Sequence, residues 1–160
     1  MEDQNLTPTS PSGISSQERS MGMWMHLGPL LASLVQVFIS IPFLTLIVAI
    51  ILFYSQKDKG EFVRANGKES LNFQITLSLV LVVLMILIAF IFGGALLTAF
   101  LGGELDSSSG GALGMVGSGL LIGTLFIVIG FGALILMVIG SKRAHEGEVY
   151  RYPLSWRLVK

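Results

Sequence analysis

The sequence contains no cysteine in its 160 residues, which excludes disulfides, zinc–thiolate sites and thiol nucleophiles. Charged residues are also scarce: they make up 12% of the chain, against about 25% in a typical soluble domain. The formal net charge is zero, and no basic stripe or stacking platform suggests a nucleic-acid partner. The composition therefore argues against an ordinary soluble enzyme and against a nucleic-acid-binding protein.

Charge is absent altogether from three long runs, residues 20–56, 70–103 and 107–141. Each run is longer than the ~20 apolar residues that cross a bilayer as a helix. The core helix of a soluble protein would carry a polar face, whereas these runs are apolar all round. The sequence therefore predicts an all-α fold, a polytopic integral membrane protein.

The three runs predict four membrane spans, at about residues 20–40, 42–55, 71–101 and 112–139. The first run is too long for one helix, and we expect a break at Ser40–Pro42, because proline disrupts helical hydrogen bonding and restricts the residue before it. The alternative is three spans, with one long helix around Pro42. Residues 1–16 are rich in Ser, Thr and Pro and predict a disordered cytoplasmic tail, which leaves residues 17–160 as the membrane domain.

The basic residues indicate an orientation. All ten Lys and Arg lie before the first predicted span, between the second and third, or after the fourth. Since basic residues stay on the cytoplasmic side, we expect a multi-pass protein of the cell membrane with both termini cytoplasmic. The acidic, glycine-rich loop at residues 102–111 would lie on the opposite side.

Two polar segments fall on the predicted cytoplasmic side. The stretch from Lys57 to Gln74 has helical spacing and predicts an interfacial helix that leads into the third span. The C-terminal segment mixes basic residues with Tyr150, Tyr152 and Trp156, a composition typical of a segment lying on anionic headgroups.

No catalytic set, cofactor site or metal site assembles from the sequence. The two histidines, His26 and His145, are far apart, and a metal site needs more ligands. His26 and Gln36 are candidate intramembrane polar groups, for which hydrogen bonding to a neighbouring helix is the ordinary role. Glycines of the fourth predicted span have a spacing that lets helices approach closely, and the candidates for helix packing are Gly114, Gly119 and Gly123.

Several short segments resemble a family of small bacterial and archaeal membrane proteins of unknown function. They are Glu18–Arg19, Met25–Leu27, Phe62–Arg64, Gly67–Gln74 and Gly147–Leu154. That family is distantly grouped with the channel-forming Tic subunit of the chloroplast inner-envelope translocon. The resemblance covers residues 17–160 and implies four membrane helices, with no established enzyme activity and no cofactor.

The sequence thus favours a non-enzymatic membrane protein that presents a cytoplasmic interaction surface. The residues expected to form it are Arg64, Lys68, Glu69, Asn72, Phe73, Gln74, Tyr150, Tyr152 and Pro153. The expected partners are the lipid bilayer and either a second copy of the chain or another membrane protein. The alternative hypothesis is a channel-like or translocon-associated transport component.

Overall fold

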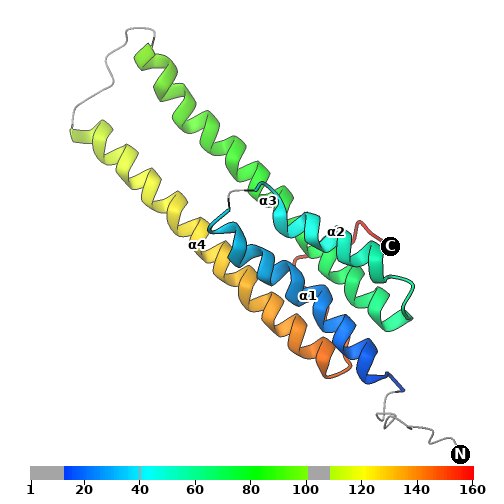
Figure 1. Cartoon of the computed structure of the whole chain (residues 1–160). Helices are drawn as coiled ribbons and strands as arrows, with labels where there is room; N and C mark the ends of the chain where they lie inside the picture. The colour runs from blue at the N-terminus through cyan, green and yellow to red at the C-terminus, as the bar shows by residue number, and fades with distance from the viewer. Residues whose placement is uncertain (1–12, 40, 101–108) are drawn as a thin grey trace, which may run out of the picture. The chain divides into compact units, whose positions relative to one another are not determined.

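The computed structural model describes residues 13–39, 41–100 and 109–160, and these residues form helices without any strand (Figure 1). The helices are α1 (Ser16–Gln36), α2 (Leu44–Gln56), α3 (Glu61–Phe100) and α4 (Ser109–His145). The all-α prediction is confirmed for the described residues. Of the predicted disordered tail (residues 1–16), residues 1–12 lie outside the described ones, and Ser16 is already the first residue of α1. Of the predicted acidic loop (residues 102–111), residues 102–108 lie outside them, and residues 109–111 begin α4.

α1 begins with a capping box. The backbone N–H of Glu18 donates to Ser15 Oγ at 3.2 Å, and the backbone N–H of Ser15 donates to Glu18 Oε2 at 2.9 Å. These two bonds satisfy donors that the first turn of a helix leaves unpaired.

The break that proline predicts is confirmed, since α1 ends at Gln36 and α2 begins at Leu44. Pro42 has no N–H to donate, and Phe43 adopts a left-handed conformation with φ of 57°. Ser40 lies outside the described residues.

The chain divides into two compact units, which we describe separately. The first unit contains α1, α2, the start of α3 up to Ser78, the end of α4 from Leu134, and the C-terminal tail (residues 146–160). The second unit contains the parts of α3 and α4 between Leu79 and Ala133. All ten Lys and Arg residues belong to the first unit.

Close packing in the first unit depends on glycine. A Cβ atom on Gly67 of α3 would lie 2.9 Å from Phe53 Cδ2 of α2 and 3.3 Å from Met25 Sδ of α1. α1 and α2 also pack directly against each other, as Figure 1 shows. The three helices can therefore meet closely at a point where a larger side chain would have to displace its neighbours.

Two helical segments are long and apolar enough to cross a membrane, Glu61–Gly94 and Val116–His145. Only 12% and 11% of their most apolar windows are buried, which is unlike the core helix of a soluble protein. α2 has 13 residues, too few to span, and α1 does not meet the same criterion. The spans predicted at residues 20–40 and 42–55 exist as helices, and their crossing of the membrane stays a prediction.

Candidate functional site

A buried histidine lies at the centre of the first unit. His26 of α1 has no exposed surface, and its Nδ1 lies 2.8 Å from Tyr152 Oη of the C-terminal tail. Its Nε2 lies 3.0 Å from Asn66 Oδ1 of α3. One side chain therefore joins α1, α3 and the tail, and we call these three residues the His26 cluster.

The hydrogen bonds of Asn66 determine which ring nitrogen carries the proton. Asn66 Nδ2 donates to the carbonyl of Phe62 at 3.1 Å, so Asn66 Oδ1 is the acceptor that faces His26. Nε2 of His26 must then donate, and Nδ1 accepts from the Tyr152 hydroxyl. Both nitrogens of a neutral imidazole are satisfied, and the site has structural rather than proton-transfer geometry.

Tyr152 is held on several sides. Its ring stacks on Phe73 of α3 with centroids 4.1 Å apart, and the edge of Tyr150 meets it at 5.0 Å. A Cβ on Gly140 of α4 would lie 2.9 Å from Tyr152 Oη and 3.2 Å from His26 Nδ1. Burial is the main cause that raises the pKa of Tyr152 above its usual value, so its hydroxyl stays a donor.

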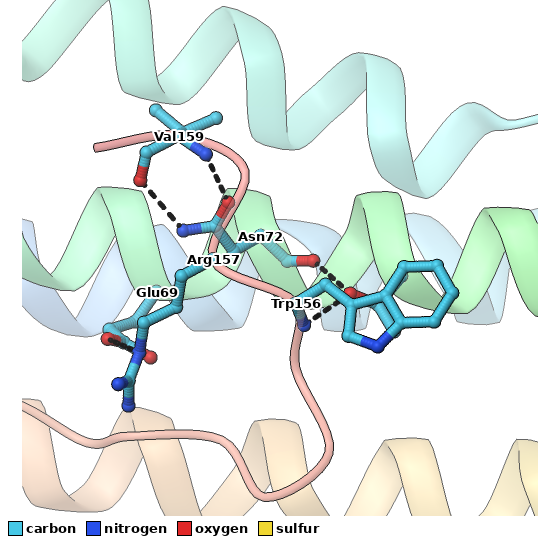
Figure 2. Close-up of polar contacts among 6 residues, drawn as sticks. Glu69, Asn72, Trp156, Arg157 and Val159 are labelled. Carbon is cyan, nitrogen blue, oxygen red and sulfur yellow. Dashed lines mark hydrogen bonds and ion pairs between the residues drawn. The ribbon is translucent and has the colours of Figure 1, made fainter.

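A second set of contacts attaches the tail to one face of α3 (Figure 2). Asn72 accepts from the backbone N–H of Val159 at 2.7 Å and donates to the Val159 carbonyl at 3.0 Å. Thr76 Oγ1 accepts from the backbone N–H of Trp156 at 2.9 Å. Arg157 Nε and Glu69 Oε1 add an ion pair of 3.5 Å. We call these hydrogen bonds and the ion pair the tail clamp, and Figure 2 draws it.

The spacing of the clamp residues explains why they share a face. Glu69, Asn72 and Thr76 follow one another at intervals of three and four residues, which is one stripe of a helix. Thr76 also donates to the Asn72 carbonyl at 2.8 Å, so its hydroxyl is used in both directions. The two bonds from the Asn72 amide to the backbone of Val159 hold this part of the tail against α3.

α3 also directs polar side chains toward α1 and α4. Ser70 Oγ donates to the Met25 carbonyl of α1 at 2.6 Å. Gln74 Nε2 approaches Met137 Sδ of α4 at 3.2 Å, and Gln74 Oε1 is buried without a hydrogen-bond partner among the described residues. These contacts connect α3 to α1 and to α4.

All nine residues expected in an interaction surface belong to the first unit, and four of them are buried. Glu69, Asn72, Phe73, Gln74, Tyr150 and Tyr152 make the contacts described above. Arg64 and Pro153 are exposed, and Lys68 is half-buried. Tyr152, expected among headgroups, is instead 4% exposed, because it fills the space beside His26.

The remaining candidates lie elsewhere. Gln36 is the last residue of α1 and is half-buried. A Cβ on Gly114, Gly119 or Gly123 would meet nothing within 4 Å in the part of the chain that is described. These glycines therefore make no close contact with another described helix, and their role in helix packing stays a prediction.

The predicted site residues did not include Asn66, Ser70, Thr76 or Gly140. Ser70 lies one helical turn after Asn66, so the shared stripe could have indicated it. Gly140 gave no signal of its own, because its role depends on the tail returning across α4. Within residues 13–39, 41–100 and 109–160, no group of three His, Asp or Glu side chains is placed to hold a metal ion.

Comparison with known proteins adds one finding. A family model described as the magnetosome magnetite crystal formation protein family, MamF/MmsF, matches residues 17–159. The matched range includes α1, both membrane-length helices and nearly all of the tail. No curated protein and no solved structure matches the chain.

Proposed function

Because the chain belongs to the magnetosome magnetite crystal formation protein family, MamF/MmsF, we propose that it serves magnetite crystal formation as a non-enzymatic protein of the magnetosome membrane. Its role would be to present an interaction surface on the cytoplasmic side. α3 and α4 would anchor the chain in the bilayer, and the first unit would carry the surface. Membrane association itself follows from the family and the two apolar helices.

The observation that carries this proposal is the attachment of the tail to α3. A tail of this length without helix would ordinarily sample many conformations, and ordering it costs conformational entropy. Here the paired bonds between Asn72 and Val159 and the buried Tyr152 fix it. A surface held in one conformation binds a partner without that cost at the moment of binding.

The ordered tail presents a defined outer face. Leu154, Trp156 and Leu158 alternate along the tail and are 93%, 60% and 58% exposed. Arg151, Arg157 and Lys160 are exposed beside them. Basic groups interleaved with apolar ones suit either anionic headgroups or another membrane protein, including a second copy of this chain.

The test is to loosen the tail without removing the protein. Cells producing Asn72→Leu should retain the protein in the membrane and form smaller or fewer magnetite crystals in electron micrographs. Glu69→Gln is the matched control, since it changes a neighbouring residue of the same helix face but keeps the bonds to Val159. Normal crystals in the Asn72→Leu cells, with a tail shown to be loosened, would argue against the proposed surface.

A channel-like or translocon-associated component is the alternative, and the resemblance to the Tic subunit is what suggests it. Its structural support is slight. The amides of Asn66 and Asn72 bond to other parts of the chain. Gln74 Oε1 is buried without a hydrogen-bond partner among the described residues, as are Gln56 Oε1 and Glu69 Oε2. Ion conductance by the purified protein in liposomes would favour this alternative over the first.

A further inference from the structure

The turn between α1 and α2 is unusual, because it is both apolar and exposed. The described residues of this turn are Val37–Ile39 and Ile41–Phe43, which we call the hairpin tip, and all have apolar side chains. Val37 is 78% exposed and Phe38 is 88% exposed. A loop that emerged into water on the far side of a membrane would ordinarily be polar.

The backbone of the tip is also arranged for a place without water. Four of its N–H groups bond to nearby carbonyls: Val37 to Leu34, Phe38 and Ile39 to Val35, and Ile41 to Ile39. Leu44, at the start of α2, bonds to Ile41, and the five distances are 2.8–3.4 Å. Pro42 has no N–H to satisfy. Lipid leaves unpaired backbone groups unsatisfied at a cost of several kcal/mol each, roughly, so internal pairing is what an exposed turn in hydrocarbon requires.

The second leg of the hairpin, α2, is too short to cross the bilayer. α2 has 13 residues, about 20 Å at 1.5 Å per residue, against a hydrocarbon core of ~30 Å. It is followed at once by Lys57, and α1 carries Glu18 and Arg19 in its first turn. With these charges kept at the headgroups, the tip reaches the interior of the bilayer and no further.

We infer that α1 and α2 form a re-entrant hairpin, which enters the bilayer from the side of the C-terminal tail and turns back inside the hydrocarbon, with lipid chains covering its tip. The outward faces of its legs agree with this environment. Leu34 and Val35 of α1 and Ile47 and Ile51 of α2 are exposed. His26, the buried polar side chain of the hairpin, faces the protein interior instead.

The inference changes the expected topology. Two predicted spans, at residues 20–40 and 42–55, become one structure that begins and ends on the same side. The N-terminal end of α1, the α2–α3 connection and the tail then share a side without a crossing in between. The inference depends on the membrane location of the chain, and it is independent of any role in crystal formation.

The absence of cysteine makes the full chain suitable for single-cysteine probes. Phe38→Cys and Val37→Cys replace exposed side chains, so neither should disturb packing, and Lys59→Cys serves as a control at the open end of the hairpin. Each variant is reconstituted in phosphatidylcholine–phosphatidylglycerol vesicles. One sample is treated with a membrane-impermeant maleimide on either side, and another carries an environment-sensitive fluorophore attached beforehand in detergent.

The tip cysteines should resist the maleimide from both sides, while Lys59→Cys reacts from one. Their fluorophores should be quenched more by a spin label near the end of the acyl chain than by one at the headgroup. Reaction from the side opposite Lys59 would show that the hairpin crosses the bilayer. Reaction from the same side would place the tip in water, and resistance without lipid quenching would place it against protein; each of these results overturns the inference.

Discussion

At His26, burial disfavours a charged ring. A charged imidazolium there would be fully desolvated, and no carboxylate of the described residues contacts either ring nitrogen. The neutral ring instead receives one hydrogen bond and donates one. His26, predicted as an intramembrane polar group that bonds to a neighbouring helix, thus joins α1, α3 and the tail.

The hydroxyl of Tyr152 should contribute measurably to that junction. Tyr152→Phe keeps the stacking on Phe73 but leaves His26 Nδ1 buried without a donor, so the free energy of unfolding should fall by about 1–3 kcal/mol. Thermal unfolding in detergent micelles measures it. Tyr54→Phe, at a ring that is 62% exposed, is the control and should change the value by under about 0.5 kcal/mol. Equal effects of the two variants would contradict the role of the bond.

Gly140 offers a second test of the same junction. Gly140→Ala adds a methyl group within 3.2 Å of atoms of Tyr152, Tyr150 and His26, which should cost about 1–3 kcal/mol by overpacking. Gly130→Ala on the same helix meets nothing within 4 Å among the described residues and gains helix propensity, so it should not destabilise. Unfolding of the two variants under identical conditions separates a close approach from a general intolerance of α4 to alanine.

At the scale of elements, the tail clamp should depend on its amide more than on its ion pair. Asn72→Leu removes both bonds to Val159, and exchange of the Val159 amide hydrogen should accelerate roughly tenfold or more, as expected for about 1.4 kcal/mol. Glu69→Gln removes a partly exposed ion pair, worth about 0–1 kcal/mol, and should have a small effect. A larger acceleration in Glu69→Gln than in Asn72→Leu would reverse this ranking.

The start of α1 should respond to acid. Hydrogen bonds from the backbone N–H and the hydroxyl of Ser15 lower the pKa of Glu18 from its ordinary value of 4.5. A lowered folded-state pKa gives stability that is present above 4.5 and is lost as the pH falls through the folded value. Exchange of the first-turn amides of α1, corrected for intrinsic rates, should therefore accelerate below pH 4.5. Glu18→Gln should abolish this dependence and Glu61→Gln should retain it; a dependence unchanged in Glu18→Gln would count against the capping box.

The sequence predicts the helices better than the contacts between them. Charge-free runs and Pro42 are local signals, and they correctly indicated helices and the break between α1 and α2. The tail pairs with residues far away along the chain, since Asn72 and Val159 are 87 positions apart, and no local pattern records such a pairing. Asn72, Phe73 and Tyr152 were predicted to form an interaction surface, whereas in the structure Asn72 bonds to the tail and Tyr152 is turned inward.

At the scale of the whole molecule, the distribution of charge and the contacts of the tail both lead us to expect the tail and the start of α3 on one side of the membrane. All ten Lys and Arg belong to the first unit, where α1, α3 and the tail are joined by the His26 cluster and the tail clamp. A segment bonded to α3 near Asn72 must be on the side of the membrane from which α3 starts. A tail on the opposite side of the membrane from the start of α3 would therefore contradict both the predicted orientation and the attachment of the tail to Asn72.

The most direct measurement of this central claim is a map of sides in intact membrane vesicles. Single cysteines at Lys59, Ser107 and Lys160, introduced one at a time, are exposed to a membrane-impermeant maleimide before and after the vesicles are opened. The account predicts that Lys59→Cys and Lys160→Cys react from one side and Ser107→Cys from the other. Reaction of Lys59→Cys and Lys160→Cys from opposite sides would contradict it, because the tail could not then reach Asn72.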